Sequence, residues 1–202
     1  MGNRVGQKQG WSVVLLGCLL VVGVLITTSS ATAKGDKVSE LYRANAMVPG
    51  AVGPGASASV DIKITKFSTD EEEEDLRMAL KAHGPQGLHK RMKKHQKTGF
   101  VAIRGERGYP TYYTQEILEG GKRNILILTD REIYFEEVYN REISTQFPFT
   151  MIMMELDDEG NGQGTALLGA ELVWDEGKDV LRVTGYSAEP IRLEGIQLIK
   201  KK

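Results

Sequence analysis

The stretch Val60-Asp61-Ile62-Lys63-Ile64-Thr65 places an aliphatic residue at every second position. Side chains of a β-strand alternate between the two faces of a sheet, so this pattern predicts a strand with one buried face. Further apolar runs of strand length follow, separated by short turn-forming segments. They cover residues 100–103, 112–118, 125–128, 149–156, 165–174, 179–186 and 191–198.

The spacing of these runs indicates the fold class. The connections are too short for parallel crossovers, so the strands should pair antiparallel. We therefore expect a mainly β or α+β protein. The expected architecture is an antiparallel sandwich or open barrel of about eight to nine strands, with a helical hairpin inserted after the first strand.

Two of the runs carry more detail. Ile125-Leu126-Ile127-Leu128 has no polar alternation, which predicts a strand covered on both faces. Gly120-Gly121 precedes it and should form the turn of a hairpin. In the last run the alternation of Ile191 and Leu193 shifts phase at Gly195, and such a slip is typical of a β-bulge.

Residues 69–96 have the pattern of a helical hairpin. A polar side chain at 68–70 can cap the first helix, and the acidic residues 71–74 suit the positive end of its dipole. Gly84-Pro85 should end that helix, and a second helix should follow the proline.

The N-terminus has the three parts of a secretory signal over residues 1–33. Arg4 and Lys8 precede an apolar run at 11–26, and the small residues Ala31-Thr32-Ala33 follow it. We expect cleavage after Ala33 and export to the periplasm or the medium. If the segment is not cleaved, it would anchor the protein in the membrane instead.

Cleavage would remove Cys18, the only cysteine, and leave a mature chain without disulfides or thiolates. Lipid attachment at Cys18 is an alternative, but it would leave the apolar residues that follow Cys18 at the N-terminus of the mature chain. Residues 34–57 predict a Gly/Pro/Ala-rich flexible tether with a short helix at 34–42, and residues 58–202 a single β-rich domain. Loss of the two basic residues of the signal changes the formal net charge from −1 to −3. That charge gives no general attraction to nucleic acid or to anionic membranes.

The segment from His89 to Lys97 is the strongest local charge feature. Lys90, Arg91, Lys93 and Lys94 could contact an anionic partner of the envelope, either a polymer or a protein. We favour an explanation without a partner. The basic helix lies beside the acidic one and keeps the hairpin in register, or the charges simply form a solvated face.

Asp157, Glu159 and Asn161 place oxygen ligands at alternate positions before Gly162 and are candidates for a weak calcium site. The twelfth position of such a loop is Leu168, where an EF-hand has a bidentate glutamate. The expected flanks are strands, so a polar hairpin loop explains the same residues.

Other metal sites have less support. His83, His89 and His95 are spaced by six residues and cannot share one face of a helix. The methionines at 151–154 have apolar neighbours, which indicates core packing rather than copper binding. We therefore expect no cofactor.

No catalytic motif stands out in the chain. It has no nucleophile elbow, no His-Glu-x-x-His pair, no phosphate loop and no dinucleotide fingerprint. These observations favour an exported, non-catalytic binding or accessory domain over an enzyme. Two alternatives remain open: a carrier of an apolar ligand inside a barrel, and a hydrolase with paired acids that meet only in the fold.

The segment Phe147-Pro148-Phe149-Thr150, followed by Asp157-x-x-Gly160-x-Gly162-x-Gly164, resembles a group of uncharacterised exported bacterial proteins. The resemblance covers residues 58–199 and implies a location in the bacterial envelope. The group has no assigned activity, so the resemblance adds no site residue.

Overall fold

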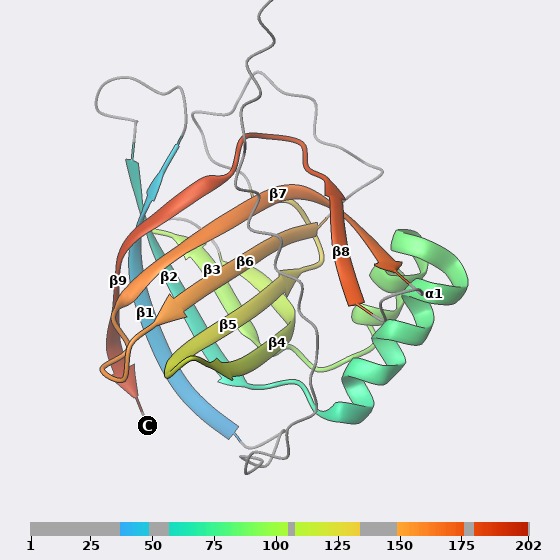
Figure 1. Ribbon diagram of the computed structural model, residues 1–202, viewed down its shortest axis with the longest axis horizontal. Helices are drawn as coiled ribbons and strands as arrows, with labels where there is room; N and C mark the ends of the chain where they lie inside the picture. Colours follow the sequence, from blue (N-terminus) through green and yellow to red (C-terminus); the bar gives the residue numbers. More distant parts are fainter. Residues whose placement is uncertain (1–36, 49–56, 105–107, 134–148, 176–179, 202) are drawn as a thin grey trace, which may run out of the picture.

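Figure 1 shows the computed structural model, which describes residues 37–48, 57–104, 108–133, 149–175 and 180–201. The expected signal at 1–33 lies outside these ranges, as does the Pro- and Gly-rich part of the expected tether. Within the described ranges the chain forms nine strands and one helix. They are β1 (Lys37–Met47), β2 (Ser57–Lys66), α1 (Asp70–Met92), β3 (Gly99–Ile103), β4 (Tyr109–Glu119), β5 (Lys122–Thr129), β6 (Phe149–Leu156), β7 (Gly162–Asp175), β8 (Val180–Gly185) and β9 (Ile191–Lys201).

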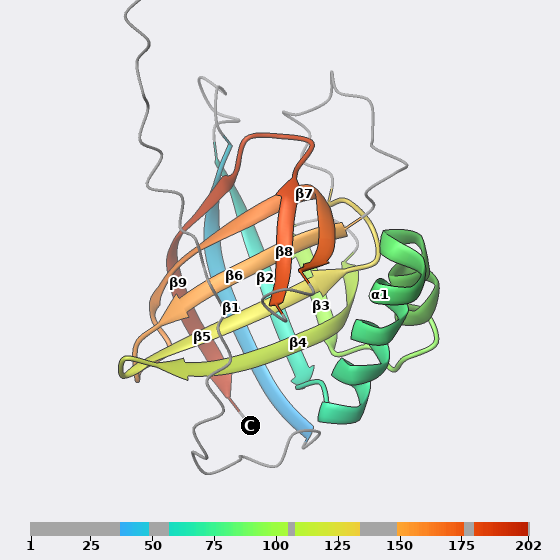
Figure 2. The same cartoon turned by 45° about the vertical axis from the view of Figure 1, so that its right-hand side comes forward.

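Eight of the strands close into an antiparallel barrel (Figures 1 and 2). From β1 to β7 each strand pairs with the next one, and β9 pairs with both β7 and β1. The strand β8 pairs with the far end of β7. The predicted mainly β, antiparallel fold is confirmed. Of the two architectures left open by the sequence, the barrel is the observed one, and it is closed.

Inward-facing side chains of alternate residues fill the barrel. An eight-stranded barrel is just wide enough for its side chains to fill the interior. Large aliphatic residues predominate there, and each of those named next is at most 1% exposed. They are Ile62, Ile64, Ile125, Ile127, Ile152, Met154, Leu156, Leu168, Ile191, Leu193 and Ile196.

A second core lies outside the barrel wall, beneath α1 (Figure 2). The apolar stripe of α1 packs on outward-facing residues of four neighbouring strands, β4 to β7. Because of this cover, β5 is buried on both faces, with Ile127 inside the barrel and Leu128 under the helix. The prediction for residues 125–128 is thus confirmed. The residues of this outer core are Leu76, Leu80, Leu88, Met92, Tyr113, Leu128, Phe149, Met151, Leu167, Ala170 and Leu172.

The strand β1 corrects the prediction that residues 34–57 are a tether with a short helix at 34–42. Residues 37–47 form a barrel strand that pairs with β2 on one edge and β9 on the other. The inward positions of β1 include Glu40, Tyr42 and Ala44, so hydrophobic alternation is weak in this stretch. Pairing on both edges determines the strand here, because β-structure depends strongly on tertiary context. The folded domain therefore includes residues well before position 58.

The inward acid of β1, Glu40, is neutralised by a cluster at one end of the barrel. Its carboxylate lies 2.9 Å from Nη2 of Arg123 on β5 and 3.1 Å from Nζ of Lys201 on β9. The hydroxyl of Tyr42 donates to Glu40 Oε2 at 2.8 Å, and Arg123 also binds Glu116. Burial alone would raise the pKa of Glu40, but the hydrogen bonds and charge of Arg123 outweigh it and hold that pKa below its ordinary value.

The predicted β-bulge at Gly195 is confirmed. Opposite β7, Gly162 pairs with Ile196 and Gly164 pairs with Leu193, so β9 has one residue more than its neighbour. The register of β9 shifts at the same place relative to β1. Gly195 adopts φ +58, the left-handed region that favours glycine.

We expect Arg123→Met to lower the free energy of unfolding by about 3 kcal/mol, because it removes the main partner of a buried carboxylate. Urea denaturation of the purified protein measures this. Arg182, which is 56% exposed and paired with Asp175 at 3.0 Å, provides the matched control. Arg182→Met should lower the free energy of unfolding by less than about 1 kcal/mol. Equal losses in the two variants would contradict the role given to Arg123.

We expect Gly195→Ala to lower the free energy of unfolding by about 1–2 kcal/mol through backbone strain alone, because a Cβ there would meet open space. Gly195→Asn should lower the free energy of unfolding by less than Gly195→Ala does, since asparagine tolerates the left-handed region. Gly162→Ala should lower the free energy of unfolding most of the three, because its Cβ would lie 1.9 Å from the carbonyl oxygen of Glu155. Urea denaturation of the three variants checks this order.

Candidate functional site

The helix α1 is a helical hairpin, as the sequence predicts for residues 69–96. Thr69 caps the first segment, and its side chain and that of Glu72 form a capping box. The backbone leaves helical geometry at Gly84, with φ 62 and ψ −160. A straight helix would separate Asp75 and Arg91 by about 24 Å, yet their side chains form an ion pair. The chain therefore doubles back at Gly84.

The carboxylate of Asp75 joins the two arms of the hairpin. It binds the guanidinium of Arg91 and lies 2.6 Å from Nε2 of His95. Hydrogen bonding from Arg91 lowers the pKa of Asp75 to about 2, and His95 adds to this effect. Arg91, one of the four predicted contact residues for an anionic partner, thus has an internal role that fits the reading of opposite charges in register.

A second carboxylate fixes the hairpin to the barrel. The side chain of Asp130, which follows β5, is 1% exposed and binds Arg131 at 3.0 Å. Nζ of Lys93 lies 3.9 Å from the same carboxylate. The ring of His89 lies 2.8 Å from the backbone oxygen of Asp130 and packs edge-on against Phe149. Lys93 and Arg131 are about half exposed, so this buried acid presents two cations at the surface.

The other two predicted contact residues, Lys90 and Lys94, point away from the packed face of the hairpin. Both are exposed, and they lie one helical turn apart. In the described part of the chain neither forms an ion pair. With Lys93 and Arg131 they make up what we call the basic surface. Sequence reasoning missed Arg131, since it follows a different strand and only the fold brings it beside Lys93.

The loop with the three calcium candidates is closed by its own hydrogen bonds. Asp157 Oδ1 accepts the backbone N–H groups of Glu159 at 2.9 Å and Asn161 at 2.8 Å. The amide of Asn161 donates to Glu159 at 3.4 Å. Within the described ranges no three His, Cys, Asp or Glu side chains are grouped to hold a metal ion. The loop joins β6 to β7, so its flanks are strands as expected.

The histidines and methionines are dispersed by the fold. His83 is exposed, whereas His89 and His95 bind different parts of the structure. Met154 points into the barrel and Met151 into the outer core. Both methionines are thus packed in a hydrophobic core, as their apolar neighbours in the sequence indicate.

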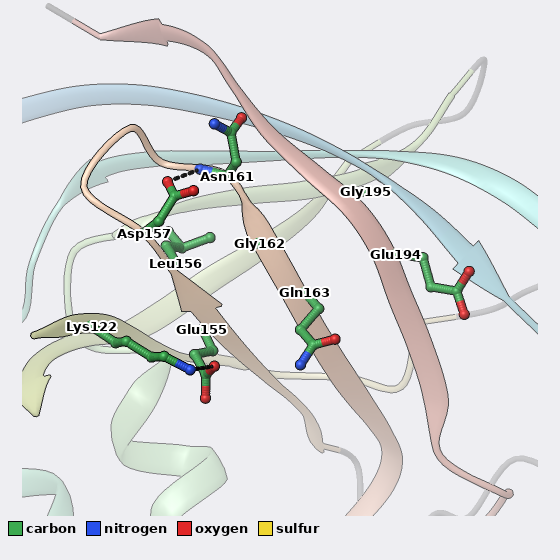
Figure 3. A pocket seen from close by; sticks show the side chains of 9 residues that line it. All are labelled: Lys122, Glu155, Leu156, Asp157, Asn161, Gly162, Gln163, Glu194 and Gly195. Atoms are coloured by element: carbon green, nitrogen blue, oxygen red, sulfur yellow. Dashed lines mark hydrogen bonds and ion pairs between the residues drawn. The ribbon is translucent and has the colours of Figure 1, made fainter. Parts of the chain in front are cut away.

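A hollow lies on the outer wall of the barrel beside the β6–β7 loop (Figure 3). Its lining comes from the start of β5, the end of β6, the start of β7 and the bulge of β9. No sequence motif indicates its polar side chains. The glycines of the Gly160-x-Gly162-x-Gly164 pattern and Gly195 do mark its position. The lining residues are Lys122, Glu155, Leu156, Asp157, Asn161, Gly162, Gln163, Glu194 and Gly195.

The fold defines the class of protein: an eight-stranded antiparallel barrel with a helical hairpin on its outer wall. Among the described residues, no helix combines the length and the apolar character needed to cross a membrane. Comparisons with protein-family models, with curated proteins and with solved structures gave no significant match.

We expect Asp75→Asn to be less stable than the wild type at neutral pH, because the hairpin loses its charged link. Since the folded-state pKa of Asp75 is lowered, its contribution is complete above the ordinary value of 3.8 and is lost as the pH falls toward 2. The difference in melting temperature between variant and wild type should therefore narrow over that interval. Asp158→Asn, in an exposed loop, is the control and should track the wild type throughout. A pH-independent difference for Asp75→Asn would contradict the assignment.

Proposed function

We propose that this chain is an exported, non-catalytic binding domain whose basic surface contacts an anionic partner of the bacterial envelope. In this proposal the barrel is the scaffold and the hairpin presents the contact residues. The observation that carries it is the exposure of Lys90 and Lys94 without ion pairs in the described part of the chain, next to two cations held in place by Asp130.

The rigidity of this surface supports a binding role. Lysine side chains lose conformational entropy when they bind, so a firmly held backbone reduces the remaining cost. Asp75 joins the two arms of the hairpin, and Leu88 and Met92 anchor the second arm on the barrel wall. The basic surface is therefore presented on a fixed frame.

The charge of the whole chain supports a local contact. The expected mature chain has a formal net charge of −3, so attraction to a polyanion would come from this surface rather than from the whole molecule. A general nucleic-acid binder would have a positive balance. Exposed charges are screened by salt, so binding should weaken as ionic strength rises.

The two alternatives have less support. Phe149 and Met151, which could have lined a carrier cavity, belong to the outer core beneath α1. Trp174 lies on the outer side, with Arg77 and Lys81 over its ring. For a hydrolase, the buried acids are far apart: Glu40 on β1 binds Arg123 at the start of β5, whereas Asp130 follows the end of β5. Each is neutralised by cations.

We expect the double variant Lys90→Gln/Lys94→Gln to bind isolated bacterial envelopes more weakly than the wild type and with less dependence on salt. Each lysine near an anionic surface contributes about 1 kcal/mol, so loss of both should weaken binding roughly 30-fold. Co-sedimentation with envelopes over a range of sodium chloride concentrations measures this.

The matched control is Lys37→Gln/Lys200→Gln, which removes the same charge from exposed positions on β1 and β9. It should bind like the wild type. Equal binding by both double variants, or binding by none of the proteins, would overturn the proposal.

A further inference from the structure

The hollow beside the β6–β7 loop has the size of a small-molecule site. Its volume is about 440 Å³, within the range of about 300–1,000 Å³ seen for ligand pockets. Every lining residue is described, and the hollow lies on the outer wall, separate from the apolar barrel interior (Figure 3).

The floor of the hollow is backbone, and glycines make this possible. A Cβ on Gly162 would clash with the carbonyl of Glu155, so β6 and β7 approach closely only with glycine there. Gly195 has open space where a Cβ would point. At the bulge the extra residue of β9 leaves the regular ladder, so backbone groups there are not held by strand pairing.

The side chains of the walls are polar except for Leu156, and two of the three carboxylates pair with a cation. Glu155 pairs with Lys122, and Asp157 accepts two backbone N–H groups. Glu194 lies 3.6 Å from Arg192. The amides of Gln163 and Asn161 add both donors and acceptors.

This lining selects a class of ligand by chemistry. An anion would face three carboxylates. An apolar molecule would face polar side chains, because Leu156, the one apolar side chain of the lining, is 1% exposed and packs inside the barrel. A cation would gain little, since Glu155 and Glu194 pair with cations of the protein and Asp157 is bound by two backbone N–H groups. Carboxylates that still have free lone pairs, next to amides, suit a neutral molecule whose hydroxyl groups both donate and accept.

We propose that the hollow is a binding site for a small neutral, hydroxyl-rich molecule of the size of a monosaccharide unit. Gln163 and Glu194, both exposed at the rim, are the residues that bind its hydroxyl groups. Lys122 begins β5 and Arg131 follows its end, so this site is about 30 Å from the basic surface. The two sites can therefore be tested separately.

The test uses the chain from Lys34 to Lys202, which contains every described strand and the helix. D-glucose and N-acetyl-D-glucosamine are titrated into the ¹⁵N-labelled protein, with sodium acetate and tetramethylammonium chloride as charged comparators. We expect saturable shifts of the amide signals of Gly162, Gln163 and Gly195 with at least one of the sugars. The charged compounds should cause none.

Gln163→Ala and Glu194→Ala should each weaken the sugar affinity about tenfold, as expected for loss of a ligand hydrogen bond. Gln197→Ala removes an exposed amide of β9 outside the hollow and should leave the affinity unchanged. Spectra of the free variants verify that each is folded. The proposal is overturned if neither sugar gives saturable shifts, if a charged comparator binds more tightly, or if Gln163→Ala and Glu194→Ala bind the sugar as the wild type does.

Discussion

Closure of the barrel through β9 is the constraint on which the rest of the structure depends. This strand must pair with β7 and β1 at once, and its inward side chains must reach the same core. A regular strand would turn Ile191 and Ile196 to opposite faces, since they are five residues apart. The bulge at Gly195 restores the phase, so both are buried. The closed wall in turn supports the outer core and the helical hairpin.

The strands that could be predicted are those whose inward residues are aliphatic. β2 has Val60, Ile62 and Ile64 facing the core, and its polar neighbours make the alternation plain. β1 has the same burial pattern, but its inward residues are glutamate, tyrosine and alanine. Glu40 is tolerated inside because Arg123, more than eighty residues later, neutralises it. A pairing so distant leaves no local signal, and this is why the sequence predicts a tether where the structure has β1.

The candidate sites could be predicted to a similar, partial extent. The basic run is evident in the sequence, and the opposite charges on the two helices predict contacts between them such as that of Asp75 and Arg91. The roles of Asp130 and Arg131 depend on β5 ending beneath the hairpin, which only the fold determines. The hollow is similar: its glycines are turn and bulge signals in the sequence, whereas Gln163 and Glu194 look like any exposed polar residues. Glycine patterns thus located a place on the surface without indicating its chemistry.

The pairing of β1 with β9 also has a consequence for how the protein is made. The two strands that complete the wall are the first and the last in the described chain, so their contacts have nearly the largest sequence separation possible. Such contacts form slowly, because the entropy of closing a long loop is lost before the contacts between the strands stabilise the chain. Until Lys201 has left the ribosome, β1 and β7 each have an unpaired edge. The nascent chain must therefore be protected from edge-to-edge association until β9 has been made, because the barrel can close only then.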